Sequence, residues 1–184
     1  MIKIKNLKKS FDKNVIFNGF DLCLPDTGTY YINGPSGSGK TTLMRIISGL
    51  DTEYEGTVEH SGKISYVFQE NRLIPSLTAY ENVFEVCHKK EKTLYLLKEV
   101  GLENDIDKYP AELSGGMNRR VAIARALAYD HDILLLDEPF TALDDDIKNS
   151  VIKLIKETEK DRLVLLVSHD ESEAEALGCI SVPF

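Results

Sequence analysis

Gly34-Pro35-Ser36-Gly37-Ser38-Gly39-Lys40-Thr41 is a glycine-rich loop that matches the pattern G-x-x-x-x-G-K-[ST] at every fixed position. Glycines let the backbone curl tightly, so that successive N–H groups point inward at an anion. A helix that follows such a loop adds its N-terminal amides and the positive end of its dipole. The segment therefore predicts a site for nucleotide phosphates. We expect Lys40 to reach the β- and γ-phosphates and the Thr41 hydroxyl to ligate Mg²⁺, with the other loop residues and Thr42 as further nucleotide-binding candidates.

The sequence on either side of the loop has the context that the pattern requires. Thr29 to Asn33 has the composition of a strand, and from Thr41 onward the apolar residues have helical spacing, with Gly49 near the end of the helix. A flexible glycine–serine turn is the alternative interpretation of the loop. The strand before it and the helix after it favour the phosphate site.

A second chemical signal is an apolar run that ends in two carboxylates, Ile133-Leu134-Leu135-Leu136-Asp137-Glu138. The carboxyl end of a strand is where an open α/β sheet binds ligands. Asp137 suits the shell of Mg²⁺, which prefers hard oxygen ligands. Glu138 can orient and polarise a water that attacks a γ-phosphate. The alternative is an ordinary acidic turn, and the phosphate loop in the same chain favours the catalytic interpretation.

Apolar strands alternate with helical segments on both sides of a helix-rich block. The runs Ile133–Asp137 and Leu163–Ser168 are almost continuously apolar, which is typical of a parallel sheet with both faces covered. We expect one α/β domain over residues 1–184, with the first strands and the phosphate loop in 1–71, a helical subdomain in 72–130 and the remainder of the core in 131–184. Further strands are expected at residues 2–4, 15–17, 57–59, 64–68 and 180–182, and helices at 80–87, 92–100, 117–128, 145–159 and 171–177.

The composition predicts a globular protein without affinity for nucleic acid. The chain is 42% hydrophobic and 28% charged, and its net charge of −8 provides no attractive field for a polyanion. Three widely separated cysteines match no metal-ligand or redox spacing, which favours a reducing compartment. The first residues lack a signal-peptide core, and the longest apolar runs are far shorter than the roughly 20 residues that span a bilayer. We therefore expect a cytoplasmic protein whose role at a membrane comes through a partner.

A third segment, Leu113-Ser114-Gly115-Gly116-Met117, gains meaning beside the phosphate loop and the acidic strand end, because it resembles the LSGGQ signature of ABC ATPases. The following residues, Asn118 to Ala126, are also similar to that family, and the signature stands between the phosphate loop and the acidic strand as it does there. The resemblance covers essentially the whole chain. It implies a P-loop NTPase (RecA-like) fold with a mainly parallel sheet core, an N-terminal antiparallel β subdomain and an inserted helical subdomain.

The same resemblance implies roles for four more positions. Phe11 would stack on the adenine ring of ATP, and Gln69 would contact the metal and the attacking water. Residues 141–144, ending at Asp144, resemble the D-loop, which crosses to a second subunit. His169 matches the switch histidine that contacts the γ-phosphate, so Glu138, His169 and Gln69 are the candidate catalytic residues.

Members of this family form head-to-tail dimers with each ATP between one subunit's phosphate loop and the other's signature. Ser114 and the amides of Gly115 and Gly116 would then bind the γ-phosphate across the dimer. Met117 replaces the usual glutamine, and we expect reduced or unchanged hydrolysis from this change. The sequence stops at Phe184, soon after the switch histidine, so we expect no regulatory C-terminal domain.

The resemblance favours the motor subunit of a membrane transporter that uses ATP and Mg²⁺. Residues 69–78 and 81–83 are similar to importer subunits of the nitrate, sulfonate and taurine type, and Phe140 is also importer-like. The implied partners are a second ATPase subunit and transmembrane subunits, which would hold the protein at the inner face of the cell membrane. The alternative is a soluble ABC ATPase acting on ribosomes, on DNA or as a regulator. The single cassette, the acidic charge and the lack of sustained heptads disfavour it.

Overall fold

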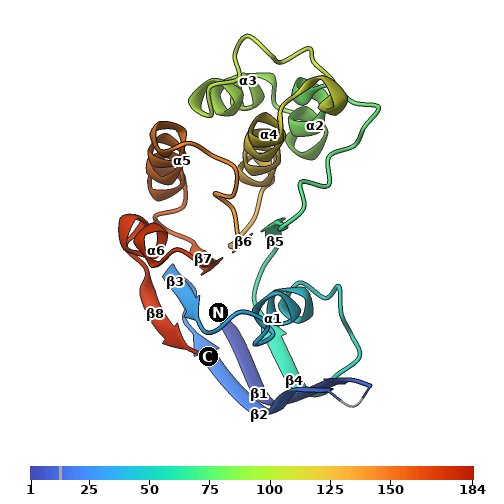
Figure 1. Cartoon of the computed structure of the whole chain (residues 1–184), viewed down its shortest axis with the longest axis vertical. Coiled ribbons are helices and arrows are strands. Elements are labelled where there is room, and N and C mark those ends of the chain that lie inside the picture. The colour runs from blue at the N-terminus through green and yellow to red at the C-terminus, as the bar shows by residue number, and fades with distance from the viewer. Residues whose placement is uncertain (13) are drawn as a thin grey trace.

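A five-stranded parallel sheet lies at the centre of the computed structural model, which describes residues 1–12 and 14–184. The strand order is β5-β6-β7-β3-β8, and each neighbouring pair is parallel (Figure 1). This arrangement confirms the parallel sheet that the apolar strands predicted. The strands are β3 (Gly28–Asn33), β5 (Ile64–Val67), β6 (Ile133–Asp137), β7 (Leu163–Val167) and β8 (Ile180–Pro183).

Alternate residues of the central strands belong to two different cores. Leu134 and Leu136 of β6 pack with the helices on one face of the sheet, whereas Ile133 and Leu135 face the opposite side. Both sets are buried, because successive side chains of a strand point to opposite faces. The helices that contribute to the first core are α2 (Ala79–Cys87), α3 (Lys90–Glu99), α4 (Gly115–Ala128), α5 (Asp145–Thr158) and α6 (Glu171–Leu177).

The second face of the sheet is covered by an antiparallel sheet together with helix α1 (Lys40–Ile47). This sheet has the order β2-β1-β4, formed by β1 (Ile2–Phe11), β2 (Asn14–Leu24) and β4 (Glu55–His60). The sequence predicted only short strands at the start of the chain. β1 and β2 are long, but bulges around Asn6 shift their register, and a bulge interrupts the alternation on which strand prediction depends.

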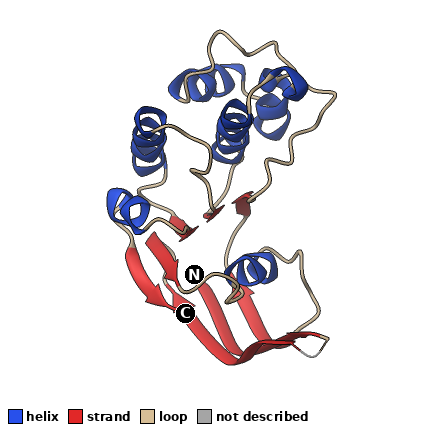
Figure 2. Ribbon diagram, in the orientation of Figure 1, coloured by secondary structure: helices blue, strands red, loops and turns tan. Residues whose placement is uncertain are grey.

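The residues between β5 and β6 form a group of packed helices, α2, α3 and α4, at one end of the molecule (Figure 2). Helix α2 begins with a capping box in which Thr78 and Glu81 bind each other's backbone N–H groups. A short 3-10 turn at Pro110–Glu112 precedes α4. Within the described residues, no helix combines the length and the apolar character needed to cross a membrane.

A buried charged cluster joins the starts of β6 and β7. His131, two residues before β6, lies with its Nε2 3.0 Å from Glu159 Oε2, and both side chains are almost fully buried. Arg162, just before β7, also donates to the Glu159 carboxylate at 3.1 and 3.2 Å. Burial by itself raises the pKa of Glu159, but the hydrogen bonds from His131 and Arg162 outweigh it and hold this pKa below its usual value.

We therefore expect Glu159→Gln to lower the free energy of unfolding by roughly 3 kcal/mol at pH 7, because it breaks a buried pair. Since the folded pKa of Glu159 is depressed, its contribution is complete above the unfolded pKa, about 4.3, and is lost as the pH falls through the folded pKa. Urea unfolding of both proteins between pH 7 and pH 3 measures this. The difference in the free energy of unfolding between the parent protein and Glu159→Gln should narrow below about pH 4.3.

The matched control is Glu157→Gln in the last turn of α5, two residues before Glu159, whose pair with Lys153 is exposed. It should change stability by less than about 0.5 kcal/mol. A difference between Glu159→Gln and the parent protein that stays constant from pH 7 to pH 3 would contradict the ion-pair account.

Candidate functional site

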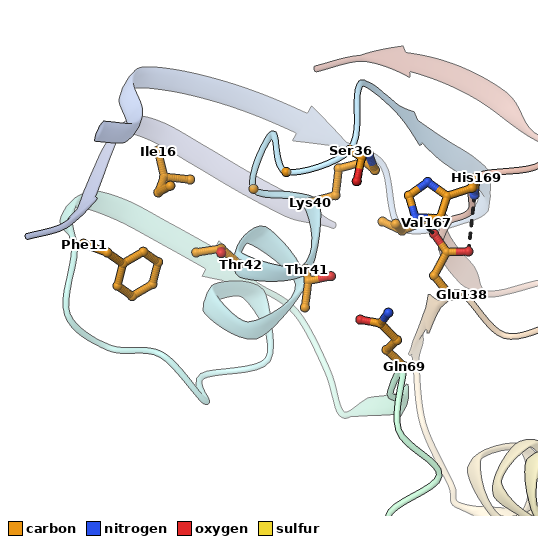
Figure 3. A pocket seen from close by; sticks show the side chains of 12 residues that line it. Phe11, Ile16, Ser36, Lys40, Thr41, Thr42, Gln69, Glu138, Val167 and His169 are labelled. Atoms are coloured by element: carbon orange, nitrogen blue, oxygen red, sulfur yellow. Dashed lines mark hydrogen bonds and ion pairs between the residues drawn. The ribbon is translucent and has the colours of Figure 1, made fainter. Parts of the chain in front are cut away.

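Four parallel strands deliver the predicted site residues to one edge of the sheet. β3 leads into the glycine-rich loop, β5 is followed by Gln69, β6 ends at Asp137, and β7 is followed by Ser168 and His169. Their carboxyl ends enclose a cavity of about 380 Å³ (Figure 3). It is lined by Phe11, Ile16, Ser36, Gly37, Gly39, Lys40, Thr41, Thr42, Gln69, Glu138, Val167 and His169.

Two glycines give the loop its curl. Gly37 has a φ of +77° and Gly39 a φ of +103°, a backbone region that residues with a side chain rarely adopt. Gly39 is also the N-cap of α1, and a methyl group built on it would collide with the Ile16 side chain of β2. The loop therefore packs closely against the antiparallel sheet, and the first N–H groups of α1, which lack intrahelical acceptors, belong to residues that line the cavity.

Lys40 is held across its own loop. Its Nζ donates to the carbonyl oxygens of Gly34 at 2.6 Å and Pro35 at 2.8 Å, and the residue is only 6% exposed. The Ser38 hydroxyl is buried and has no hydrogen-bond partner among the described residues. A fixed ammonium group, an unpaired hydroxyl and a helix N-terminus together suit a polyanion such as a chain of phosphates.

Asp137 lies behind the cavity with both carboxylate oxygens occupied. Thr41 Oγ1 donates to Oδ1 at 3.2 Å, and the Tyr66 hydroxyl donates to Oδ2 at 3.1 Å. Burial raises the pKa of Asp137, and these two hydrogen bonds only partly offset the effect. Hydroxyl and carboxylate oxygens so close together are the hard donors that Mg²⁺ prefers, so the residues present fit that ion.

Glu138 has an unusual backbone conformation and faces His169. Its φ is +50°, in the left-handed region. Its Oε2 accepts the backbone N–H of His169 at 3.3 Å, and its Oε1 lies 3.2 Å from His169 Nε2 (Figure 3). Burial raises the pKa of the Glu138 carboxyl, with His169 as the main opposing influence. A carboxyl group with a raised pKa at the edge of a cavity is suited to proton transfer.

Phe11 lies on the side of the cavity away from Glu138 and His169, near helix α1 (Figure 3). It ends β1 and is half-exposed, so one face of its ring is available to a ligand. The Nζ of Lys9 lies 4.7 Å from the ring centroid. A flat apolar surface at one side and charged groups at the other give the cavity two chemically different parts.

Several predicted site residues are outside the cavity lining. Ser114 and Asp144 cap α4 and α5 by accepting the backbone N–H groups of Met117 and Ile147. Gly116 packs against the D-loop, where a methyl group on it would lie 2.6 Å from the carbonyl oxygen of Ala142. The other predicted residues outside the lining are Gly34, Pro35, Ser38, Gly115 and Asp137.

Several residues that line or support the site were not predicted from the sequence. Ile16 and Val167 line the cavity, Tyr66 binds Asp137, and Arg119 donates to backbone carbonyls of the site. A usable signal existed only for Arg119, which shares a helix face with Ala122, Ile123 and Ala126, all buried. The others come from elements whose proximity no local pattern encodes.

The phosphate-binding loop at the start of α1 and the carboxylates at the end of β6 define a P-loop nucleotide-binding protein. The family comparison is more specific. Residues 17–141 match the model of the ABC transporter family, which is more than half of the chain. The chain therefore belongs to the ABC transporter ATP-binding family.

Curated relatives include import proteins for sulfur oxyanions. The sulfate/thiosulfate import ATP-binding protein CysA of Escherichia coli is 37% identical over 94% of this chain and 54% of its own length. The aliphatic sulfonates import ATP-binding protein SsuB of Bacillus subtilis is 38% identical over 96% of this chain and 75% of its own length. The chain thus spans about half the length of the first of these relatives.

Two solved structures of a bacterial ABC cassette resemble the fold closely. One, described as a dimeric cassette of an ABC transporter, has a TM-score of 0.88 at 34% identity and covers 100% of this chain and 94% of its own. The other is described as a dimeric post-hydrolysis state bound to ADP and Pi. It has a TM-score of 0.87 at 34% identity, and the match covers 96% of this chain and 91% of that structure's chain. These likenesses confirm the predicted fold class.

The loop geometry predicts different effects of two similar substitutions. Gly39→Ala should lower the free energy of unfolding by about 2–4 kcal/mol, because it adds a clash with Ile16 to an unfavourable φ. Gly37→Ala should cost only about 1 kcal/mol, since open space surrounds its methyl group. Denaturant unfolding measures both. Equal losses from the two substitutions would show that the contact with Ile16 has no energetic weight.

Proposed function

We propose that this chain binds MgATP in the cavity at the carboxyl edge of the sheet and hydrolyses it to ADP and phosphate. The observation that carries the proposal is that the phosphate loop, Glu138 after β6 and His169 after β7 line one cavity, with Asp137 hydrogen-bonded to Thr41 beside it. ATP binding is also in keeping with membership of the ABC family. The proposal assigns each group a part in holding the nucleotide or in cleaving its terminal phosphate.

The phosphate loop would hold the triphosphate. The loop amides and the start of α1 would surround the phosphates, and Lys40 would exchange its carbonyl contacts for the β- and γ-phosphates. The half-exposed ring of Phe11 would stack on the adenine. The nucleotide would then extend across the cavity from its apolar side to its charged side.

Mg²⁺ would be held by Thr41 and Asp137, with Gln69 as a third oxygen donor from the segment after β5. When bound, the ion would neutralise negative charge on the phosphates. Tyr66, which donates to the second oxygen of Asp137, would keep this carboxylate aimed at the Thr41 hydroxyl.

Glu138 would orient the attacking water and accept its proton. Its carboxylate has a raised pKa and borders the cavity, which suits a general base in this position. His169, 61% exposed in its side chain and close to Glu138, would be free to contact the γ-phosphate. Gln69 would complete the set of polar groups around the reacting water.

A second subunit would complete the site. Ser114 and Gly115 are exposed at the N-terminus of the 14-residue helix α4 and do not line this chain's own cavity. In a head-to-tail dimer these residues and Gly116 would bind the γ-phosphate of the partner's ATP at a helix N-terminus. Asp144 would lie at the same interface. The dimeric form of the two similar structures supports this arrangement.

The chain would act as the motor subunit of an ABC importer of a small solute, as the names of its relatives suggest. Residues 1–71 and 131–184 would form the nucleotide-binding body, and residues 72–130 the helical part that carries the signature. Gln69, which precedes this helical part, would also face transmembrane subunits. These partners would hold the protein at the cytoplasmic side of the membrane.

Glu138→Gln tests the hydrolytic role. It should leave the Kd for ATP within about threefold of the parent value and lower kcat by on the order of 10²–10³-fold. The reason is that glutamine keeps the size and shape of the side chain but cannot act as the general base. Steady-state phosphate release and equilibrium ATP titration measure the two quantities. Glu171→Gln, an exposed carboxylate at the start of α6, is the control. Undiminished turnover by Glu138→Gln would refute its assignment.

Co-purification tests the transporter role. A tagged copy expressed at its native level should be recovered from membranes in mild detergent together with a multi-span membrane protein. A salt wash without detergent should leave the complex in the membrane fraction. Recovery with soluble proteins, ribosomes or DNA alone would contradict the transporter role and leave the ATPase assignment in place.

A further inference from the structure

Arg119 is a buried cation whose hydrogen bonds all go to the site's supporting segments. It is 2% exposed and lies on α4, five residues after Ser114. An arginine side chain has five N–H donors in a planar fork. Here the guanidinium donates to the Asn71 Oδ1 and to the main-chain carbonyl oxygens of Phe68, Gln69, Asp137, Glu138 and Pro139.

These acceptors belong to two segments that the chain separates widely. Nη1 binds the carbonyls of Phe68 and Gln69 after β5, whereas Nη2 binds those of Asp137 and Glu138 at the end of β6. Arg119 thus connects the backbone of Gln69, which is proposed to contact the metal and the water, with the backbone of Asp137 and Glu138. Five of the six hydrogen bonds of Arg119 go to the main chain, so they constrain where each side chain starts.

The positive charge of Arg119 is stabilised without a direct ion-pair partner. None of the ion pairs among the described residues includes it, although the carboxylates of Asp137 and Glu138 interact with it over a longer distance. Burial lowers the pKa of the guanidinium to about 10, so it remains charged at neutral pH. A buried charge held only by carbonyl dipoles is a costly arrangement, and it requires well-aligned acceptors.

The guanidinium also holds the unusual backbone at Glu138. A φ of +50° at a residue other than glycine persists only where its surroundings impose it. The Glu138 carbonyl accepts Arg119 Nη2 and also the Thr141 hydroxyl at 3.1 Å. Together with the backbone N–H of Thr141 at 3.4 Å, these bonds hold the peptide that follows Glu138.

A second arginine of α4 extends the connection along the segment after β5. Arg125 donates from Nη1 to the carbonyl of Arg72 at 2.9 Å and from Nη2 to that of Asn71 at 3.3 Å. Helix α4 therefore binds the main chain of residues 68–72 at four carbonyls. Its N-terminus carries Ser114, so one rigid element reaches from the signature to the backbone of the site.

We propose that Arg119 is a positioning residue that fixes Gln69 and Glu138 relative to each other and connects both to the signature helix. The inference rests on the ATP hydrolysis proposed above. Arg119 does not line the cavity and contacts only the supporting segments of the site, so its loss should affect turnover and leave nucleotide affinity nearly unchanged. Lysine should not replace it, because a point charge with three donors cannot span acceptors on two segments.

Arg120 provides a matched control on the same helix. Its Nη1 donates to the carbonyls of Val100 and Gly101 at 2.8 Å each, at the end of α3. Arg120→Gln therefore removes the same charge and two arginine–carbonyl bonds, but away from the cavity. A general weakening of α4 would appear in both variants, whereas a positioning effect would appear only at Arg119.

The test compares Arg119→Gln, Arg119→Lys and Arg120→Gln with the parent chain. Steady-state hydrolysis gives kcat and KM, equilibrium titration gives the Kd for MgATP, and hydrogen–deuterium exchange reports on backbone opening. Both Arg119 variants should lose at least tenfold in kcat, with Kd within about threefold, because small displacements of reacting groups are costly. Their exchange should rise in residues 68–72 and 138–141. Arg120→Gln should keep kcat within about twofold and raise exchange near residues 100–102.

Three results with the glutamine variants would overturn the inference: Arg119→Gln with the parent kcat, Arg119→Gln with a loss confined to Kd, or an equal loss of kcat in Arg120→Gln. Full activity of Arg119→Lys would show that charge, and not the fork, is what matters, and would also refute it. A parent chain that binds ATP without hydrolysing it would instead remove the proposed function. In that case unchanged exchange at residues 68–72 and 138–141 in the Arg119 variants would refute the connection itself.

Discussion

The complete burial of β6 and β7 side by side is the constraint on which the rest of the structure depends. Every residue of both strands is buried, and apolar side chains cover both faces of this part of the sheet. A polar side chain in the middle of these strands would lose its water without a partner, at a cost of several kcal/mol. Polar groups therefore gather where the strands end, at Asp137, Glu138, Ser168 and His169. The chemistry of the site is concentrated at this edge because the interior excludes it.

The same constraint explains the two-sided architecture. Leu134 and Leu136 require one apolar layer, and Ile133 and Leu135 require another. Helices supply the first layer, whereas the second is an antiparallel sheet with α1 packed beside it. Because α1 begins at Lys40, the layer that completes the core also carries the phosphate loop. Core packing and anion binding thus share one helix, whose apolar face is buried while its N-terminus borders the cavity.

Helix α4 has an equivalent double function on the other layer. Its apolar face packs with α2 and α3, its N-terminus presents Ser114, and Arg119 reaches from it into the supporting backbone of the site. The proposed trans contact at the signature and the proposed general base are therefore joined by the first part of α4, from Ser114 to Arg119, and by one guanidinium. A rigid connection of this kind would let the partner's nucleotide influence the geometry at Glu138, with no need for a long chain of intermediate contacts.

Local pattern was sufficient for the glycine-rich loop, the acidic end of β6, most helices and the alternation of strand and helix, because each depends on residues close together in the chain. It was insufficient for the length of β1 and β2, whose bulges break the period of two, and for the antiparallel cover of the second face. Only the tertiary structure brought Tyr66 to Asp137 and Arg119 to Phe68 and Glu138. These partners lie between 19 and 71 residues apart, and a hydrogen bond between distant segments leaves no periodicity in the sequence of either one.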